Sequence, residues 1–599
     1  MFRPNHILKQ SKSEAMPKFV FFFDTETSNK QYDPKTKLLT FKFCYIALYR
    51  YDPIKNFYLV KELEAWTPAE VIDFISNNAQ GNQRYWITAH NISFDARVIN
   101  LFKGLTKQGW QRTKFIEENI NFIATFRRDK TTLTIINNQQ LFNTSLKNLG
   151  QSIGLEKKEV EFDSVSDKEL VLYCRRDVDI MVKSWSSLTS FLTTNSLGQF
   201  KMTAASLSLS IFTHRFYHQP IYIHNNIKVI ELERESYHGG RVEVFFKGNY
   251  NKGEVFNLDI NSMYPFLMKT IKLPVKLLYY TERNPQRFLK INQNKFGFII
   301  NADIETNKPI IPIIRDSKLI FPTGRFNASF AEPEFNLLKE YGRLLKVNKI
   351  AVYKKDYIFS DFVDYFYNQR KEWERENKTA FAFFAKIILN SLYGKFGQKN
   401  TIYKKVGYDP NADDGIIETF DSRTGKWIKT KVIDGIIEES AGYEEGYNAF
   451  VSLSSYITSA ARAYLYRLIA RAGAYNVLYC DTDSIFVNRE GYQNIVSYIN
   501  NNELGRLKCV EHSQGIQISG LKDYVFHNKT VIKGIKKSAV KIAPNEYQQE
   551  QFENWRGSLR NGNLNIIRVK IITKKLSQSY TKGIVMPDHW VKPFALSEV

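Results

Sequence analysis

Cysteine is scarce in this sequence, and long apolar runs are missing from it. The four cysteines in 599 residues are Cys44, Cys174, Cys480 and Cys509, and no two of them form a C-x-x-C pair. This spacing argues against a cysteine zinc site and against a disulfide framework, and it is typical of a reducing compartment. No apolar stretch reaches the roughly 20 residues that a membrane-spanning helix needs.

The first 18 residues are polar and basic, without the apolar core of a secretory signal. We expect them to form a loose N-terminal tail, with an organelle-targeting leader as the alternative. We therefore predict a soluble, intracellular protein without a membrane partner. Its place would be the host cytoplasm if the protein is viral.

Acidic residues are outnumbered by basic ones. The chain has 84 lysines and arginines against 61 aspartates and glutamates, a net charge of +23. Such a charge suits a polyanionic partner, above all nucleic acid, although codon usage in an AT-rich genome would also enrich lysine. The length and the 43% hydrophobic content allow several domains with real cores.

Two carboxylates one residue apart are the most informative local feature. Asp481 and Asp483 lie between two short apolar runs in residues 476–486, a strand-turn-strand pattern. Like charges held this close are costly unless a cation binds between them. The pattern favours metal-dependent phosphoryl chemistry, and Asp259 at the end of another apolar run is a candidate third carboxylate.

A helical pattern carries a second set of polar residues. Lys386, Asn390, Tyr393 and Gly394 recur at i, i+4, i+7 and i+8 and therefore share one helix face. A buried core stripe would not contain a lysine and an asparagine. A cation, an amide and a tyrosine on one face would suit a nucleoside triphosphate.

Acidic residues also follow a regular order in the first third of the chain. Asp24 and Glu26 end an apolar strand pattern, Asp95 follows a second apolar run, and Tyr173 and Asp177 share a helix face at i and i+4. Taken singly, each has an ordinary explanation as a strand-end or solvated acid. Their order and their neighbours make the combination informative.

Together these stretches resemble the motifs of family B DNA polymerases. Asp24-Thr-Glu26, Asn91-Ile-Ser-Phe-Asp95 and Tyr173-Cys-Arg-Arg-Asp177 resemble the three-part signature of 3′–5′ proofreading exonucleases. Asp259-Ile-Asn-Ser-Met-Tyr-Pro265, Lys386-Ile-Ile-Leu-Asn-Ser-Leu-Tyr-Gly394 and Tyr479-Cys-Asp-Thr-Asp-Ser484 resemble polymerase motifs A, B and C. The resemblance covers the chain from about residue 19 onward.

The resemblance implies two metal-dependent centres. In the exonuclease, Asp24, Glu26, Asp95 and Asp177 would be the ligands and Tyr173 would orient a water, while Asn91 and Phe94 would hold a single-stranded 3′ end. The family's catalytic lysine corresponds to Lys157 or Lys158, and Lys158 is our candidate. In the polymerase, Asp259, Asp481 and Asp483 would hold two Mg²⁺ ions, with Mn²⁺ as a substitute.

The same resemblance assigns ligand contacts. Tyr264 would exclude a 2′-hydroxyl, so that deoxynucleotides are the expected substrates. The residues expected to bind the nucleotide are Ser262, Tyr264, Lys386, Asn390, Tyr393 and Arg370, the last with a solvated helix face as its alternative. Those expected to bind primer-template or single-stranded DNA are Asn91, Phe94, Tyr237, Gly239, Gly240, Ser391, Gly394, Thr482, Lys522, Tyr524 and Lys533.

Two extra segments suggest a subgroup. Residues 273–354 are more than a palm domain alone needs, and the pattern of residues 399–449 indicates a β-hairpin insertion. Such insertions are similar to those of protein-primed polymerases of bacteriophages and linear plasmids, which implies a terminal-protein primer and strand displacement. The second insertion is longer and more acidic than that pattern. A nucleic-acid-primed polymerase and a non-catalytic replication-associated DNA-binding protein are the alternatives.

The expected fold is a multidomain α/β (α+β) monomer. It combines a ribonuclease-H-like exonuclease with a right-hand polymerase and two insertions. The expected segments are a tail at 1–18, the exonuclease at 19–196, the first part of the palm at 197–272, insertion 1 at 273–354, the fingers at 355–398, insertion 2 at 399–449, the second part of the palm at 450–543 and the thumb at 544–599.

Overall fold

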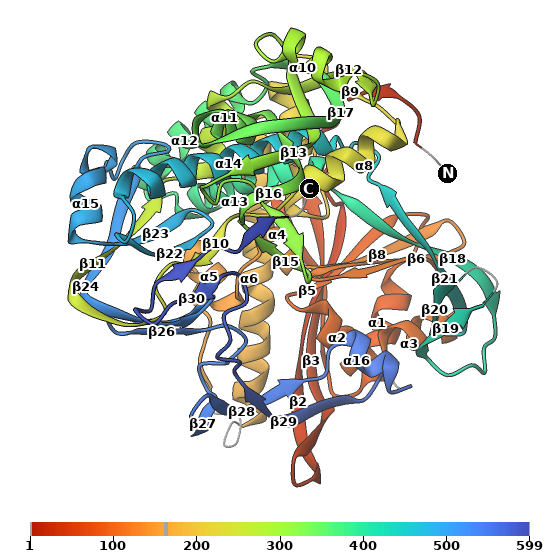
Figure 1. Ribbon diagram of the computed structural model, residues 1–599. Coiled ribbons are helices and arrows are strands. Elements are labelled where there is room, and N and C mark those ends of the chain that lie inside the picture. Colours follow the sequence, from red (N-terminus) through yellow and green to blue (C-terminus); the bar gives the residue numbers. More distant parts are fainter. Residues whose placement is uncertain (1–2, 161–165, 423–424, 563, 598–599) are drawn as a thin grey trace.

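The computed structural model describes residues 3–160, 166–422, 425–562 and 564–597. A mixed sheet with flanking helices occupies the N-terminal third of the chain, and the helices and sheets of the later segments lie above it and beside it (Figure 1). Among the helices within these ranges, none combines the length and apolar character needed to cross a bilayer.

The N-terminal region is built around strand β2 (Phe19–Asp33). It pairs antiparallel with β3 (Thr36–Asp52) and parallel with β5 (Arg84–Ala89), which pairs parallel with β8 (Thr131–Asn137). Phe22 packs on one side of the sheet with Trp185, whereas Phe21 and Phe23 pack on the other side. Both faces are therefore covered, as parallel strands require. The remaining strands of this region are β4 (Asn56–Ala65), β6 (Gln111–Glu118) and β7 (Asn121–Arg128).

Helices on the two faces of this sheet begin at clear capping signals. Helix α6 (Asp167–Thr194) starts with a capping box between Ser166 and Glu169, and α1 (Pro68–Asn78) starts with one between Thr67 and Glu70. The 28 residues of α6 bring its buried stripe, including Tyr173 and Asp177, against β2. The shorter helices here are α2 (Ile92–Val98), α3 (Leu101–Lys107), α4 (Gln139–Phe142) and α5 (Leu146–Ser152).

A seven-stranded sheet forms the centre of the palm region. Strand β11 (Gly248–Ile260) lies between β23 (Ser484–Asn488) and β24 (Leu507–Gly520), and all these pairings are antiparallel. Apolar residues of α9 (Met263–Thr270) and of the long helix α14 (Val451–Ala472) pack against this sheet. The other strands are β10 (Val242–Val244), β22 (Val477–Asp481), β25 (Asp523–Phe526) and β26 (Lys529–Ile532).

The expected fingers segment is a helical hairpin. Helices α12 (Ser360–Arg375) and α13 (Thr379–Phe396) are joined by a short turn in which Asn377 adopts φ 56°, a left-handed conformation that asparagine tolerates. Their apolar faces join the core that also contains α6. The helical hairpin is thus anchored on both the palm and the N-terminal region.

Each of the two expected insertions is a sheet. Residues 273–354 contribute β12 (Leu273–Thr281), β13 (Gly297–Thr306), β16 (Thr323–Ala331) and β17 (Gly342–Asp356), with α11 (Glu332–Tyr341) between the last two. Residues 399–449 form four strands in the order β18-β21-β20-β19, in which β19 and β20 form a β-hairpin and β21 and β18 extend it to a sheet. These strands are β18 (Lys399–Tyr408), β19 (Gly415–Asp421), β20 (Lys426–Ile433) and β21 (Ile436–Glu445).

The two chain ends differ most from the prediction. The N-terminal segment is not a loose tail, because β1 (His6–Ile7) pairs with β9 (Tyr222–Ile223) and Arg3 donates hydrogen bonds to the carbonyls of Gly446 (2.7 Å) and Ala449 (2.6 Å). Residues 544–597 do not form a separate unit either. Strand β29 (Ile567–Lys575) pairs with β3, and β28 (Glu546–Phe552) and β27 (Val540–Ala543) continue the N-terminal sheet beyond it.

The C-terminal segment contacts both the N-terminal region and insertion 1. Trp555 of α16 (Trp555–Arg560) packs among Phe102, Phe115 and Phe122 of the N-terminal region. Further on, β32 (Ala595–Ser597) pairs parallel with β16 of insertion 1. The C-terminal segment therefore connects three regions by backbone pairing and aromatic packing.

Candidate active sites

A tight hairpin and the end of a neighbouring strand bring three carboxylates together in the palm. In the register of the sheet, Ser484 of β23 lies opposite both Asp259 of β11 and Asp481 of β22. The turn closes through a hydrogen bond from Asp483 N to Asp481 O (2.7 Å), with Thr482 in the left-handed region at φ 63°. Asp483 O accepts from Ile260 N at 2.8 Å, which fixes the turn beside Asp259.

The charges at this centre repel each other. Burial and the nearby Asp483 raise the pKa of Asp259 to about 6, against the opposing effect of Lys508 and Lys386. Burial, with a contribution from Asp481, also raises the pKa of Asp483. Carboxylates that resist ionisation in this way form a donor set that a divalent cation would stabilise.

The nucleotide candidates surround these acids. The rings of Tyr264 on α9 and Tyr393 on α13 stack at 4.7 Å between centroids and 8° between planes. Lys386, Asn390 and Gly394 lie on the exposed face of α13, and a Cβ atom at Gly394 would meet no other atom within 4 Å. The stacked tyrosine rings therefore form a flat surface beside the open space at Gly394.

A cationic cavity of about 630 Å³ opens beside motif A. Ser262, which begins α9 in the left-handed conformation at φ 49°, lies on one side, and Arg370 and Lys371 of α12 lie on the other. Arg370 pairs with Glu374 of its own helix at 2.9 Å. Lys508, which faces Asp259 in the sheet register, also lines this cavity.

The loop Tyr237–Gly240 contacts the Asp481–Asp483 turn. A Cβ atom at Gly240 would lie 2.8 Å from Thr482 Cγ2, so glycine is needed for this close approach. Thr482 N in turn donates to Arg241 O at 2.8 Å. A Cβ atom at Gly239 would meet nothing within 4 Å, which leaves that part of the loop accessible.

Arg462 is a residue that the sequence reasoning missed. It is 2% exposed, pairs with Glu334 of insertion 1 (2.7 Å), and donates to the carbonyls of His238 (2.8 Å) and Gly239 (3.0 Å). It thereby ties the loop to α14 and α11. The stretch 451–472 also contains Arg467 and Arg471, so no signal in the sequence indicated that Arg462 is the arginine that is buried and needs partners.

The Lys522 and Tyr524 candidates lie on the same side of the sheet as Asp481. Lys522 Nζ lies 3.2 Å from Asp481 Oδ2, and its backbone NH donates to Tyr479 Oη at 3.0 Å. Tyr524 packs against Phe486 at 5.3 Å between ring centroids. Lys533 is exposed and reaches this corner through its backbone, which donates to Lys522 O at 2.8 Å.

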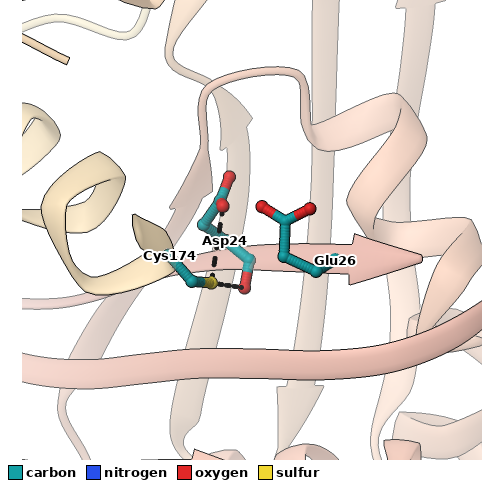
Figure 2. A group of neighbouring side chains, drawn as sticks. All are labelled: Asp24, Glu26 and Cys174. Atoms are coloured by element: carbon teal, nitrogen blue, oxygen red, sulfur yellow. Dashed lines mark hydrogen bonds between the residues drawn. The ribbon is translucent and has the colours of Figure 1, made fainter. Parts of the chain in front are cut away.

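A second acidic centre lies on β2 of the N-terminal sheet. Asp24 and Glu26 project from the strand toward the same region, and Cys174 of α6 approaches from the side (Figure 2). Asp95 on α2 accepts hydrogen bonds from Thr25 N (3.2 Å) and Thr25 Oγ1 (2.7 Å). The strand and two helices thus bring the predicted acids to one place.

Lys157, and not Lys158, faces this centre. The Lys157 ammonium pairs with Asp177 and lies 4.4 Å from the centroid of the Tyr173 ring. Lys158, the next residue of this irregular segment, is exposed. Of the two lysines that the sequence left open, the structure thus brings Lys157, and not our candidate Lys158, to this centre.

The electrostatics of this centre also favour a cation. Burial and the neighbouring carboxylates raise the pKa of Glu26 to about 8 and the pKa of Asp24 well above its usual range. Burial raises the pKa of Asp95 to about 7, against its hydrogen bonds from Thr25. Within the described residues, the buried Asp177 Oδ1 has no hydrogen-bond partner. An orphan oxygen among acids that resist ionisation fits a metal-binding role.

Cys174 is the second residue that the sequence reasoning missed. Its Sγ lies 3.1 Å from Asp24 O and 3.4 Å from Asp24 Oδ2. Burial raises the pKa of this thiol, so it acts as a donor to Asp24. Its position between Tyr173 and Asp177 was the only signal, and a cysteine there has an ordinary role as a small buried residue.

The residues expected to hold a single-stranded end flank this centre. Asn91 precedes α2 and is exposed, and its side-chain oxygen accepts from Ser93 Oγ at 3.0 Å. Phe94 is half-buried on the first turn of α2, one residue before Asp95. A partly exposed ring next to the acids is available for contact with a ligand.

Comparison with known proteins agrees with this arrangement. Residues 154–474 match the family model described as DNA polymerase type B, organellar and viral. This match spans more than half of the chain, and the chain therefore belongs to that family. The fold is similar to that of Phi29 DNA polymerase complexed with primer-template DNA, with a TM-score of 0.66 and 16% identity over 94% of this chain and 100% of that one.

Several curated relatives carry related names. A "Probable DNA polymerase" of Neurospora intermedia is 24% identical over 57% of this chain and 36% of its own length. The "DNA-directed DNA polymerase" of Enterobacteria phage PRD1 is 28% identical over 43% of each chain. The "DNA polymerase" of Streptococcus phage Cp-1 is 22% identical over 74% of this chain and 78% of its own. The chain thus covers less than half of the length of the first two relatives.

Proposed function

We propose that this protein is a template-directed DNA polymerase with a 3′–5′ proofreading exonuclease. One observation carries the proposal: two separate acidic centres with raised carboxyl pKa values lie on one chain, one in a palm-type hairpin and one on an exonuclease-type strand. Mg²⁺ is the proposed cofactor of both centres, with Mn²⁺ as a substitute. Primer-template DNA, single-stranded DNA and deoxynucleoside triphosphates are the proposed ligands.

In the polymerase centre, Asp259, Asp481 and Asp483 would hold the metal ions. When bound, such ions lower the pKa of the primer 3′-hydroxyl and neutralise charge on the triphosphate. Lys386 on the exposed face of α13, together with Arg370, Lys371 and Lys508 around the cavity beside Ser262, would bind the phosphates. These fixed positive charges favour the transition state, in which charge shifts toward the leaving pyrophosphate.

The stacked tyrosines would select the sugar. Tyr264 is held against Tyr393 on a nearly parallel plane, so it cannot move aside without losing that packing. A deoxyribose would fit over the ring, whereas a 2′-hydroxyl would clash. The new base pair would lie next to this stack, in the open space at Gly394 and beside the exposed Asn390 and the half-buried Ser391 of α13.

In the exonuclease centre, Asp24, Glu26, Asp95 and Asp177 would hold the metal ions that activate the attacking water. Lys157, paired with Asp177 and placed over Tyr173, would keep that tyrosine oriented toward the scissile phosphate. Asn91 and Phe94 would hold the unpaired 3′ end, the ring by stacking on a base. The thiol of Cys174 would fix the rotamer of Asp24.

The segment assignments 19–196, 197–272, 355–398 and 450–543 remain our proposal for the exonuclease, palm and fingers. We place the thumb role in β28, β29 and α16; the two strands extend the N-terminal sheet, and Trp555 of α16 packs against the N-terminal region. We propose that insertion 1 contacts a terminal protein whose hydroxyl primes synthesis, as in protein-primed relatives. The phage relatives support replication in a host cytoplasm.

Insertion 2 carries features that suit strand displacement. It docks on the N-terminal region through Arg112, which lies 3.4 Å from Glu438, and Ile433 packs in the same core as Trp555 of α16. At its far end, Phe420 and Trp427 face each other across β19 and β20 at 5.4 Å and are 55% and 71% exposed. We propose that this pair stacks on a base of the displaced strand.

Extension of a primed single-stranded circle tests these roles together. With Mg²⁺ and deoxynucleotides, the wild-type protein should give products many template lengths long. Asp483→Ala should abolish synthesis, and an Asp24→Ala/Glu26→Ala double variant should lose only 3′ degradation. Arrest after one circle would contradict strand displacement, and a complete lack of synthesis with folded protein would leave a DNA-binding role. Synthesis initiated without a DNA primer, dependent on an added terminal protein, would test protein priming.

A further inference from the structure

A large groove lies behind the palm, outside both catalytic centres. Its volume is about 810 Å³, and it runs between the second half of α14, insertion 1 and residues 590–593. Val477, the first residue of β22, lines the groove, whereas Asp481 at the other end of the same strand belongs to the polymerase centre. Four residue steps of a strand separate the two by about 13 Å. The groove is therefore a separate site.

The charge of the groove is strongly positive. Lys308, Arg471 and Lys592 line it, are exposed, and form no ion pair with any residue that the structure describes. Glu340 is the only carboxylate among the described lining residues, and Arg467 neutralises it at 2.6 Å. Three uncompensated cations around one concave surface favour an anionic ligand.

Aromatic rings provide the second part of the lining. Trp590 meets Tyr475 edge to face at 5.0 Å, and Tyr498 lies 4.9 Å beneath the guanidinium of Arg471. Tyr475 is 60% exposed although it is held in the left-handed region at φ 64°. A bulky exposed side chain in a disfavoured backbone conformation is an outlier that occurs preferentially at functional sites.

We propose that this groove binds a nucleotide unit, that is, a base with its phosphate. The base would stack on Tyr475 or Tyr498, and Arg471, Lys592 and Lys308 would bind the phosphate. The exposed flat rings favour a base over an acidic peptide, which would need the cations alone. A free nucleotide and a nucleotide within a single strand share this chemistry.

Photocrosslinking on the full-length protein tests the proposal. The protein is first saturated with an unlabelled hairpin primer-template that ends in a dideoxynucleotide and with the next complementary nucleotide, dCTP, so that DNA and nucleotide fill the polymerase centre. One arm then uses 8-azido-dATP and the other a short oligothymidylate that contains 4-thiothymidine. Peptide mapping should find the crosslink at Tyr475, Tyr498 or Trp590. The arm that crosslinks distinguishes free nucleotide from strand.

Variants make the test quantitative. Arg471→Ala/Lys592→Ala and Tyr475→Ala should each weaken crosslinking at least tenfold, whereas Tyr475→Phe should retain it, because a phenyl ring still stacks. Lys55→Ala and Tyr32→Ala are matched controls, since both residues are exposed and lie outside the groove. Single-nucleotide extension of the same hairpin with a 3′-hydroxyl end should be the same in all of them, so a failed proposal here is distinguishable from an inactive polymerase.

Three results would overturn the proposal. The first is a crosslink that maps only outside the groove in both arms. The second is undiminished crosslinking in the Arg471→Ala/Lys592→Ala variant. The third is equal displacement of the oligonucleotide by polyglutamate and by unlabelled oligothymidylate, which would assign the groove to an acidic polypeptide.

Discussion

Removal of one palm carboxylate should stabilise the metal-free protein while it abolishes synthesis. Asp259 has a pKa raised from 3.8 to about 6, because it is buried beside Asp483. At neutral pH Asp259 is ionised, and its charge is less stable in the folded than in the unfolded state; Asp259→Asn removes that charge without changing the shape of the side chain. The expected result is a more stable but inactive variant.

The expected gain in stability of Asp259→Asn follows from the size of the pKa shift of Asp259. Two units of pKa correspond to about 3 kcal/mol when the group is fully ionised. Because Asp259 is only partly buried, screening by solvent reduces this to roughly 1 to 2 kcal/mol. For a unit of the size of the palm region, that corresponds to about 2 to 8 °C in melting temperature.

The stability difference between wild type and Asp259→Asn should increase with pH. Since the folded pKa is higher than the unfolded pKa, the destabilisation is complete above about pH 6 and is lost as the pH falls toward 3.8. The difference between wild type and Asp259→Asn should therefore be largest at pH 8 and roughly half as large at pH 5. Added Mg²⁺ should stabilise the wild type more than the variant.

Scanning calorimetry in EDTA, with and without excess Mg²⁺, measures all of these quantities. Asp129→Asn is the control, because Asp129 is an exposed carboxylate on a turn remote from both centres, and it should change nothing. A wild type that is as stable as Asp259→Asn, or more stable, at pH 8 without metal would refute the electrostatic reasoning. So would a difference that grows as the pH falls.

Three further predictions concern single side chains. Lys157→Ala should lower exonuclease activity on a single-stranded 3′ end by roughly a hundredfold, whereas Lys158→Ala should leave it unchanged; the reverse result would restore Lys158. Tyr264→Ala should reduce discrimination against ribonucleotides by roughly 10- to 200-fold, measured as the ratio of kcat/KM for dCTP and CTP, and an unchanged ratio would exclude Tyr264 as the sugar filter. Trp427→Ala should slow synthesis through duplex DNA by about tenfold but not synthesis on a gapped template, and equal slowing on both templates would count against a stacking role.

Short-range patterns in the sequence predicted the architecture of the acidic sites well. Asp481 and Asp483 were assigned to a strand-turn-strand unit, and β22 and β23 form that unit. Lys386 and Asn390 were assigned to one helix face, and both are exposed on α13. Hydrophobic periodicity and turn-forming residues act over a few positions of the chain. A single sequence is therefore enough to predict the local elements that depend on them.

Features that depend on distant pairing could not be predicted in this way. Arg462 reaches a loop more than 220 positions earlier in the chain, and its importance depends on that contact. The choice between Lys157 and Lys158 depends on which one faces α6, and an irregular segment has no period that would decide it. The pairing of β29 with β3 joins residues over 500 positions apart, and neither strand indicates its partner.

That last pairing has a consequence for proofreading. Backbone hydrogen bonds join the C-terminal strands to the sheet that carries Asp24 and Glu26, and β32 joins the same segment to insertion 1. These pairings therefore fix the distance between the two acidic centres. Under the proposed function, a primer end would then reach the centre on β2 only by unwinding from its template. The melting of terminal base pairs, at about 1.4 kcal/mol for each step, would set how often the enzyme edits, so that AT-rich ends are edited more often than GC-rich ones.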